Sequence, residues 1–468
     1  MTQAEGYPAR TPTPWHGFLT FAGVLLILGT GLFGYGISIH ALIFVCLCWV
    51  GLNTRYLGHH YPAIRSMMSD GIRNALPAVY IFILIGMVIA SYMHSGTIAS
   101  LIVYGLDLLA PDVFLAAGFV LCALMSVVTG TSWGTVGTLG VVLMGLGQSM
   151  GVSFPLIAGV VISGATFGDK LSPVSDTTNL AAMSAGTDLY AHIRSMLITT
   201  TPTFLLVLVI LLLLDSSADP LTAAGQSADI QVALRQAYSI NPIVAVLPLL
   251  VLVGLSVSRQ SAEVSMTASV VTALALALLY QGRSLGEVLN ALWQNTPGHT
   301  GVADIDALLG RGGIASMSWT LLLALMALAL GGLLNGGGFL KALLEGAIAR
   351  IRRASTLIAT TIASGIVGNM GLGEAYVSII LNAQLFREAF DRARLNRAVL
   401  SRSVEEGATL STGLIPWTTA GAFYAATLGV PTLEYAPYAF LNYLNPLVSI
   451  GMAMLGIGLL RKPGVLRD

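Results

Sequence analysis

The stretch SGATFGDKLSPVSDTTNL, residues 163–180, decides the fold, because it places polar and charged residues directly after the apolar run 154–162. Pro173 has no backbone N–H and clashes with the preceding helical turn, so a helix over 155–185 is expected to unwind here. Unwinding frees carbonyl oxygens, and nearby side chains add carboxylates, hydroxyls and an amide. Apolar runs on both sides favour a broken membrane helix over the alternative, an exposed loop.

The composition of the whole chain agrees with a membrane location. The chain has 468 residues, with only 22 Lys and Arg and 22 Asp and Glu, and 55% of its residues are hydrophobic. Soluble domains carry about 25% charged residues, so this composition excludes an ordinary soluble enzyme and a disordered protein. No basic run is present to neutralise phosphates, which argues against a nucleic-acid partner. The mean hydropathy of +0.81 indicates a polytopic membrane protein, whose first partner is the lipid bilayer.

Apolar segments of about 20 residues, the length that crosses a bilayer, recur along the chain. Eight are uninterrupted: 17–34, 37–54, 75–94, 199–214, 240–258, 261–281, 313–335 and 442–460. Two more, 155–185 and 395–430, are predicted to be broken helices because each has polar residues and a proline in its middle. In 112–149 and 355–390, a Gly-rich or polar centre leaves halves too short to span, so both are predicted to be re-entrant hairpins. The expected fold is all-α, with ten crossings.

Basic residues predict the orientation. With the N-terminus in the cytoplasm, only Arg235, Arg283 and Arg311 of the 22 Lys and Arg fall outside, and Lys170 and Arg402 fall within the broken helices. The other seventeen lie on the cytoplasmic side, as the positive-inside rule requires. Both termini are therefore expected in the cytoplasm.

An internal repeat divides the chain. With an offset of 243 residues, positions 164–186 show seven identities with their counterparts, and Gly130 falls on Gly373. Each half holds five crossings, an odd number, so the halves are expected to insert upside down, as in many secondary transporters. The predicted organisation is a cytoplasmic tail, a first repeat, an external linker, a second repeat and a second cytoplasmic tail, over 1–16, 17–215, 216–239, 240–460 and 461–468.

Oxygen-bearing side chains of the first half predict a cation site. Asp169 and Asp176 supply carboxylates for Na⁺, and the same segment offers Thr177, Thr178 and Asn179. Hard cations prefer such oxygen ligands. The tip of the first hairpin adds the hydroxyls of Thr131 and Ser132. The same tip also matches the G-x-S-x-G pattern, in Gly130-Thr131-Ser132-Trp133-Gly134, so an intramembrane serine hydrolase is a remote alternative. A third interpretation is close helix packing through Gly130 and Gly134.

The second half places its polar residues differently. Glu374 stands at the hairpin position of Thr131, and Glu406 precedes the second broken helix; both are candidate cation or proton sites. A second set is predicted to form a substrate site or second site: Lys170, Asn369, Thr409, Thr418 and Thr419. Glu405 has an alternative reading as an interfacial charge paired with Arg402. The histidines are expected in loops or at the ends of spans.

The segment 163–180, continuing through Ala185-Gly186-Thr187-Asp188-Leu189 to Arg194, resembles the signature of the NhaC family of sodium/proton antiporters. The stretch 414–432 is similar to that family too, and the resemblance covers nearly the whole chain. The family commonly has Asp followed by Gln where this chain has Glu374-Ala375, Asp in place of Glu406, and Asn in place of Thr418. These departures bear on the exchanged species more than on coupling to sodium.

The resemblance implies a secondary transporter of the cytoplasmic membrane that exchanges Na⁺ for H⁺, with no enzymatic activity and no cofactor. Burial favours the protonated form of a carboxylic acid, so protons and sodium compete for one group. The family also includes exchangers of malate and lactate and carriers of amino acids, so Na⁺-coupled transport of a small organic or amino acid is the alternative. Transporters of this type are often dimers, and a homodimer is one expected assembly.

Overall fold

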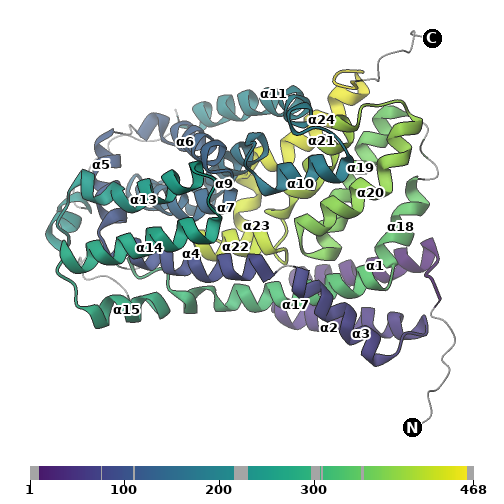
Figure 1. Cartoon of the computed structure of the whole chain (residues 1–468), viewed down its shortest axis with the longest axis horizontal. Helices are drawn as coiled ribbons and strands as arrows, with labels where there is room; N and C mark the ends of the chain where they lie inside the picture. Colours follow the sequence, from purple (N-terminus) through teal and green to yellow (C-terminus); the bar gives the residue numbers. More distant parts are fainter. Residues whose placement is uncertain are drawn as a thin grey trace.

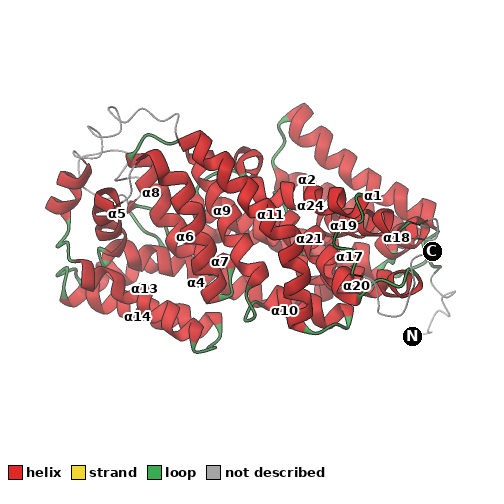
Figure 2. Ribbon diagram, turned by 90° about the horizontal axis from the view of Figure 1, so that it is seen from above, coloured by secondary structure: helices red, strands yellow, loops and turns green. Residues whose placement is uncertain are grey.

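The computed structural model describes residues 10–74, 76–108, 111–215, 230–296, 306, 309–348, 351 and 353–460. In these residues the chain forms helices and connecting loops, with no strand, as Figure 2 shows in red and green. The predicted tails fall partly outside this set, at 1–9 and 461–468. Of the predicted linker 216–239, residues 216–229 also lie outside the described residues, whereas 230–237 are helical.

The first half of the chain contains a series of helices that ends in a long apolar one. They are α1 Pro14–Gly29, η1 Thr30–Gly34, α2 Ile39–Tyr56, α3 Tyr61–Asn74, α4 Leu76–His94, α5 Thr97–Leu108, η2 Pro111–Val113, α6 Phe114–Thr129, α7 Ser132–Thr135, η3 Val136–Gly140, α8 Val141–Ser149, α9 Phe154–Leu171, α10 Asp176–Ala185 and α11 Leu189–Asp215.

The second half contains a comparable series. It consists of α13 Pro242–Val257, α14 Ala262–Leu279, α15 Leu285–Trp293, η4 Ile314–Met317, α17 Ser318–Gly336, α18 Phe339–Ile348, α19 Ala354–Leu372, α20 Ala375–Arg392, α21 Arg397–Thr412, α22 Thr419–Leu428, α23 Thr432–Tyr435, η5 Ala436–Tyr438 and α24 Phe440–Met454.

Seven helices in the described part of the chain are long and apolar enough to cross a membrane. The expectation of an all-α polytopic membrane protein is confirmed in this form. One of the seven is α19, whose 19 residues correct the expectation that each half of 355–390 is too short to span. Its glycines and hydroxyls are compatible with a continuous helix. One pair of helices in the described residues, Val79–His94 and Thr97–Leu108, bends by 69° at its break, as a broken span or a re-entrant loop does.

The broken helices lie at the centre of the molecule. In both views α9, α10 and α21 lie between a group that contains α5, α13 and α14 and a group that contains α1, α18 and α20 (Figures 1 and 2). Close backbone approaches hold them there: a Cβ on Gly164 of α9 would lie 2.4 Å from the carbonyl oxygen of Phe119 in α6. A Cβ on Gly407 of α21 would lie 2.3 Å from that of Ile362 in α19. Each broken helix is thus pressed against the first arm of a predicted hairpin.

Candidate functional site

The break between α9 and α10 forms where the sequence predicts it. Helix α9 ends at Leu171, and α10 begins after Ser175, whose hydroxyl accepts the N–H of Thr178 at 3.4 Å. This serine is an N-cap, which satisfies one of the free N–H groups at a helix start. Ser172 donates its hydroxyl to the carbonyl oxygen of Val127 in α6 at 2.7 Å. The short connection between the two helices is therefore held against the first hairpin.

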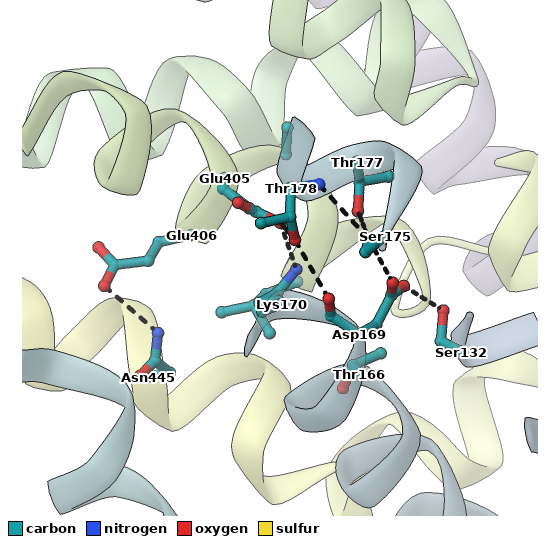
Figure 3. Close-up of polar contacts among 12 residues, drawn as sticks. Ser132, Thr166, Asp169, Lys170, Ser175, Thr177, Thr178, Glu405, Glu406 and Asn445 are labelled. Carbon is teal, nitrogen blue, oxygen red and sulfur yellow. Dashed lines mark hydrogen bonds and ion pairs between the residues drawn. The ribbon is translucent and has the colours of Figure 1, made fainter. Parts of the chain in front are cut away.

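The carboxylate of Asp169 joins three segments of chain (Figure 3). Ser132, from the hairpin tip, donates to Oδ2 at 2.7 Å, and Ser175, from the helix break, donates to Oδ1 at 2.6 Å. Asp169 is 6% exposed. A hydroxyl that donates to the carboxylate still has two acceptor lone pairs, one of which Ser175 uses for the N–H of Thr178. Carboxylate and hydroxyl oxygens of this kind are the ligands that hard cations prefer.

A second group of ionisable side chains lies next to Asp169. The ammonium of Lys170 is 3.8 Å from Oε1 of Glu405, and Nε2 of His192 is 2.7 Å from Oε2 of the same residue. The hydroxyl of Thr178 lies 3.1 Å from the carbonyl oxygen of Asp169 and 3.3 Å from Oε1 of Glu405. Lys170, His192 and Glu405 are all fully buried. This group thus connects the first broken helix to α11 and α21.

Glu406 belongs to a separate pair. Its Oε1 accepts the hydroxyl of Thr199 at 2.5 Å and the amide of Asn445 at 3.4 Å, and it lies 4.0 Å from Nε of Arg402. Glu405 and Glu406 lie three and four residues after Arg402, and the structure pairs Arg402 with Glu406. The alternative reading of Glu405 as an interfacial partner of Arg402 is therefore wrong, because Glu405 is buried and faces Lys170.

The hairpin tips share one backbone geometry. Gly130 and Gly373 end α6 and α19 with φ near +70°, in the left-handed region that favours glycine. Thr131 then caps α7 by accepting the N–H of Gly134 at 3.3 Å. Glu374 caps α20 by accepting the N–H of Tyr376 at 3.4 Å, and its Oε2 accepts the hydroxyl of Thr419 at 2.6 Å. The second tip therefore carries a buried carboxylate where the first carries a hydroxyl.

Three residues of the predicted sodium site lie apart from its centre. Asp176 is exposed at the first turn of α10, and the structure does not bring it to the carboxylate of Asp169. The amide of Asn179 donates to the carbonyl oxygens of Pro173 and Ser175, at 3.0 and 2.7 Å. Thr177 contacts only the Ser175 hydroxyl, at 3.2 Å, among the side-chain contacts described. Within the described residues no group of three or more His, Cys, Asp or Glu is placed to hold a metal.

The predicted second site has its residues on facing helices. Asn369 of α19 donates to the carbonyl oxygen of Ala408 and, at 2.9 Å, to the hydroxyl of Ser411. Thr418 caps α22 by accepting the N–H of Gly421 at 3.1 Å and donates to the carbonyl oxygen of Thr412. Thr409 is buried, and the structure shows no hydrogen bond to its hydroxyl.

Sequence reasoning missed part of this arrangement. His192 was expected in a loop or at a span end, whereas it is buried in α11, which begins ten residues before the predicted span 199–214. The polar residues His192, Arg194 and Ser195 hid this start. In the structure His192 lies against Glu405, and the carbonyl oxygen of Ser195 accepts from Arg402, both in α21. Ser175 carried a usable signal, because serine before a helix start is a typical N-cap. Ser401, whose hydroxyl lies 2.6 Å from Nδ1 of His192, carried no such signal, because only the folded chain brings the two residues together.

Comparison with known proteins now places the chain. A family model described as the Na⁺/H⁺ antiporter family matches residues 12–178 and 164–457. The chain belongs to the Na⁺/H⁺ antiporter family. It is 35% identical over 445 residues to the Na⁺/H⁺ antiporter NhaC of Alkalihalophilus pseudofirmus, covering 94% of this chain and 95% of that protein. It is also 35% identical over 432 residues to NhaC of Bacillus subtilis, covering 92% and 95%. The resemblance expected from 163–194 and 414–432 is confirmed.

One similar protein is named as an exchanger of organic anions. The Malate-2H⁺/Na⁺-lactate antiporter of Bacillus subtilis is 33% identical over 405 residues, which cover 85% of this chain and 84% of that protein. These relatives are antiporters rather than enzymes, so the hydrolase alternative is not supported. The local structure agrees, because the G-x-S-x-G match is preceded by helix α6, whereas a nucleophile elbow needs a strand before its serine.

Proposed function

We propose that this chain exchanges Na⁺ for H⁺ across the cell membrane, with the carboxylate of Asp169 at the centre of its sodium site. The observation that carries the proposal is the convergence of Ser132 and Ser175 on this carboxylate, at 2.7 and 2.6 Å. The three side chains come from a hairpin tip, a helix and a helix break. Movement of the hairpin relative to the broken helix would open or close such a site without breaking any covalent bond.

The chemistry of a buried carboxylate supports exchange at this place. An isolated charge inside a protein is expensive, so the carboxylate is stabilised by a bound cation. Among the described residues, neutral hydroxyls donate the hydrogen bonds to the Asp169 carboxylate, and the ammonium next along the chain, on Lys170, faces Glu405. A sodium ion supplies the missing counter-charge directly.

We also propose that the two halves form inverted repeats. Several local features recur at the offset of 243 residues: the left-handed glycines Gly130 and Gly373, and the close approaches of Gly164 and Gly407 to α6 and α19. Helix α10 at 176–185 corresponds exactly to α22 at 419–428. Recurrence of turns, caps and close contacts supports two copies of one unit, and an odd number of crossings in each copy would invert one of them.

The predicted placement in the membrane is part of the same proposal. The positive-inside distribution supports cytoplasmic termini, a first repeat over 17–215, an external linker over 216–239 and a second repeat over 240–460. Labelling single introduced cysteines near residues 10 and 235 with an impermeant reagent tests it. Labelling of position 235 from outside, and of position 10 only after permeabilisation, is the expected result.

A second candidate function is exchange that includes a small organic anion. The relative named a malate and lactate antiporter favours it, as do the buried cations Lys170 and Arg402. Both cations lie within 4.0 Å of a glutamate, so an anionic substrate would have to displace that partner.

Purified protein in liposomes tests both functions. A sodium gradient is imposed, and the internal pH is followed with a trapped dye, with and without malate, lactate or amino acids. Proton movement driven by sodium alone supports Na⁺/H⁺ exchange. Proton movement that requires an organic acid supports the second function, and no proton movement under any of these conditions contradicts both.

A further inference from the structure

Lys170, His192, Ser401 and Glu405 form a buried group that we call the imidazole cluster. All four side chains are 0% exposed, and they come from α9, α11 and α21. Ser132 and Ser175 already hold the carboxylate of Asp169 without help from this cluster. A histidine, a lysine and a glutamate buried together are expensive to keep for structure alone, because each charge loses its hydration. Their arrangement therefore needs a chemical explanation.

The ring of His192 has an oxygen at hydrogen-bonding distance from each nitrogen. Nδ1 lies 2.6 Å from the hydroxyl of Ser401, and Nε2 lies 2.7 Å from Oε2 of Glu405. A serine hydroxyl donates a hydrogen bond to a neutral ring nitrogen and accepts one from a protonated nitrogen. Each ring nitrogen therefore faces a polar oxygen, and the contact at Nε2 is an ion-pair distance without the angle of a hydrogen bond. A buried polar atom left without a partner would make one of the two states costly.

The charges of the region link this ring to the sodium site. With Asp169 and Glu405 as anions and Lys170 as a cation, the group carries one net negative charge when the imidazole is neutral. A proton on His192 cancels that charge, and so does a sodium ion at Asp169. A proton and a sodium ion together would leave one positive charge buried, which costs free energy.

We propose that His192 carries the exchanged proton, and that it is protonated when the sodium site is empty and neutral when sodium is bound. The proposal rests on Na⁺/H⁺ exchange at Asp169 and names the second ion's site. On sodium binding the proton leaves Nε2 or Nδ1 for water, and on sodium release it returns. Thr178 connects the two places, because its hydroxyl oxygen lies 3.1 Å from the carbonyl oxygen of Asp169 and 3.3 Å from Oε1 of Glu405, so its single proton is donated to one or the other.

Other charged or titratable groups surround α11, and they are left out of the net charge given above. Arg402 and Glu406 of α21 lie 4.0 Å apart and offset each other. Asp176 on α10 is exposed at the surface of the molecule. The remaining titratable side chains described on α11 and on the elements packed against it are Asp112, Cys122, Tyr190, Arg194, Arg397 and Tyr443, and Asp188 directly precedes α11.

Proton release on sodium binding is the direct test. Purified protein is placed in a weak buffer with a pH indicator, sodium chloride is added, and choline chloride serves as the blank. Sodium affinity is measured in parallel by calorimetry across a pH series. Below the pH midpoint of sodium affinity, we expect wild type to release about one proton per sodium bound. In the same range its apparent sodium affinity should fall about tenfold for each unit by which the pH is lowered.

The variant His192→Gln keeps an amide that reaches Glu405 but does not titrate. We expect it to bind sodium, to lose the proton release and to show a flat dependence of affinity on pH. His60→Gln makes the same change at an exposed position between α2 and α3 and should behave as wild type. Sodium binding by His192→Gln with proton release equal to wild type would overturn the proposal.

Ser401→Ala provides a second test if His192→Gln does not fold. It keeps the imidazole but removes the acceptor for its protonated Nδ1, so the pH midpoint of sodium affinity should shift to lower pH. An unchanged midpoint would overturn the assignment to His192. Failure of the underlying exchange is distinguishable, because wild type would then neither bind sodium nor release protons.

Discussion

The two hairpin tips make the same contact with opposite chemistry. In the first half the hydroxyl of Ser132 is on the tip and the carboxylate of Asp169 is on the broken helix, 2.7 Å away. In the second half the carboxylate of Glu374 is on the tip and the hydroxyl of Thr419 is on the broken helix, 2.6 Å away. One backbone scaffold thus presents a carboxylate from either side, and the ionisable neighbours of each carboxylate distinguish the two.

Those neighbours differ sharply. Asp169 is followed in the chain by Lys170, and Thr178 connects it to Glu405. Glu374 has hydrogen bonds to Thr419 and to the backbone of its own helix. We infer that the first site couples to protonation, whereas the second binds a cation or positions the helices. The predictions below test this division.

The largest effect is expected at Asp169. Asp169→Asn keeps the size of the side chain and removes the charge that attracts sodium, so sodium-driven proton movement in liposomes should be abolished. Asp176→Asn is the matched control, because Asp176 is exposed on α10, and it should retain most of the wild-type rate. Equal loss in both variants would contradict the placement of the site at Asp169.

Glu374→Gln should have a smaller effect, because Ser132 and Ser175 keep the first carboxylate in place. We expect slower exchange, with proton release on sodium binding retained. Thr419→Val tests the contact itself: residues that act through one hydrogen bond give non-additive effects, so the double variant should be little worse than Glu374→Gln alone. The measurement is the exchange rate of all three variants at matched protein density. Strictly additive losses would show that the two side chains act separately.

Ser132→Ala should weaken sodium binding without abolishing exchange. Loss of one hydrogen bond to a charged group costs about 1.5–3 kcal/mol, which corresponds to roughly a tenfold to hundredfold weaker affinity. Ser149→Ala removes a buried hydroxyl of α8 that donates to the carbonyl oxygen of Gly145 and should bind sodium normally. Calorimetry with sodium chloride measures both. An affinity equal to wild type in Ser132→Ala would place the ion elsewhere.

The sequence predicted the helix breaks that form these sites better than it predicted which side chains meet there. Pro173, Pro416 and the apolar runs around them predicted both helix breaks, because a proline acts on its own helix. Asp169 and Ser132 followed from the cost of polar groups at membrane depth. Asp176, seven residues further along, looked equivalent, but it lies beyond the helix break and is exposed. His192 and Ser401 come from helices far apart in the chain, so no local pattern could pair them.

Substitutions of the two tip glycines, Gly130 and Gly373, should have the smallest effects, but the two variants should differ clearly from each other. Gly130→Ala and Gly373→Ala each force a Cβ into the left-handed region, which costs about 1 kcal/mol. A Cβ on Gly130 would also lie 2.5 Å from Cγ2 of Val174 and 3.0 Å from its backbone carbon, whereas the nearest atom to a Cβ on Gly373 is 3.4 Å away. Gly130→Ala should therefore lower the unfolding temperature more.

The same contact links stability to binding. The atoms displaced by a Cβ on Gly130 belong to the connection that carries Ser175, so this variant should also lose sodium affinity. Gly373→Ala should keep wild-type affinity, because nothing near that Cβ belongs to the Asp169 site. Thermal unfolding in detergent, with and without sodium, measures both quantities. If Gly373→Ala lost as much sodium affinity as Gly130→Ala, the two tips would serve one shared ion site, and the division between the halves would fail.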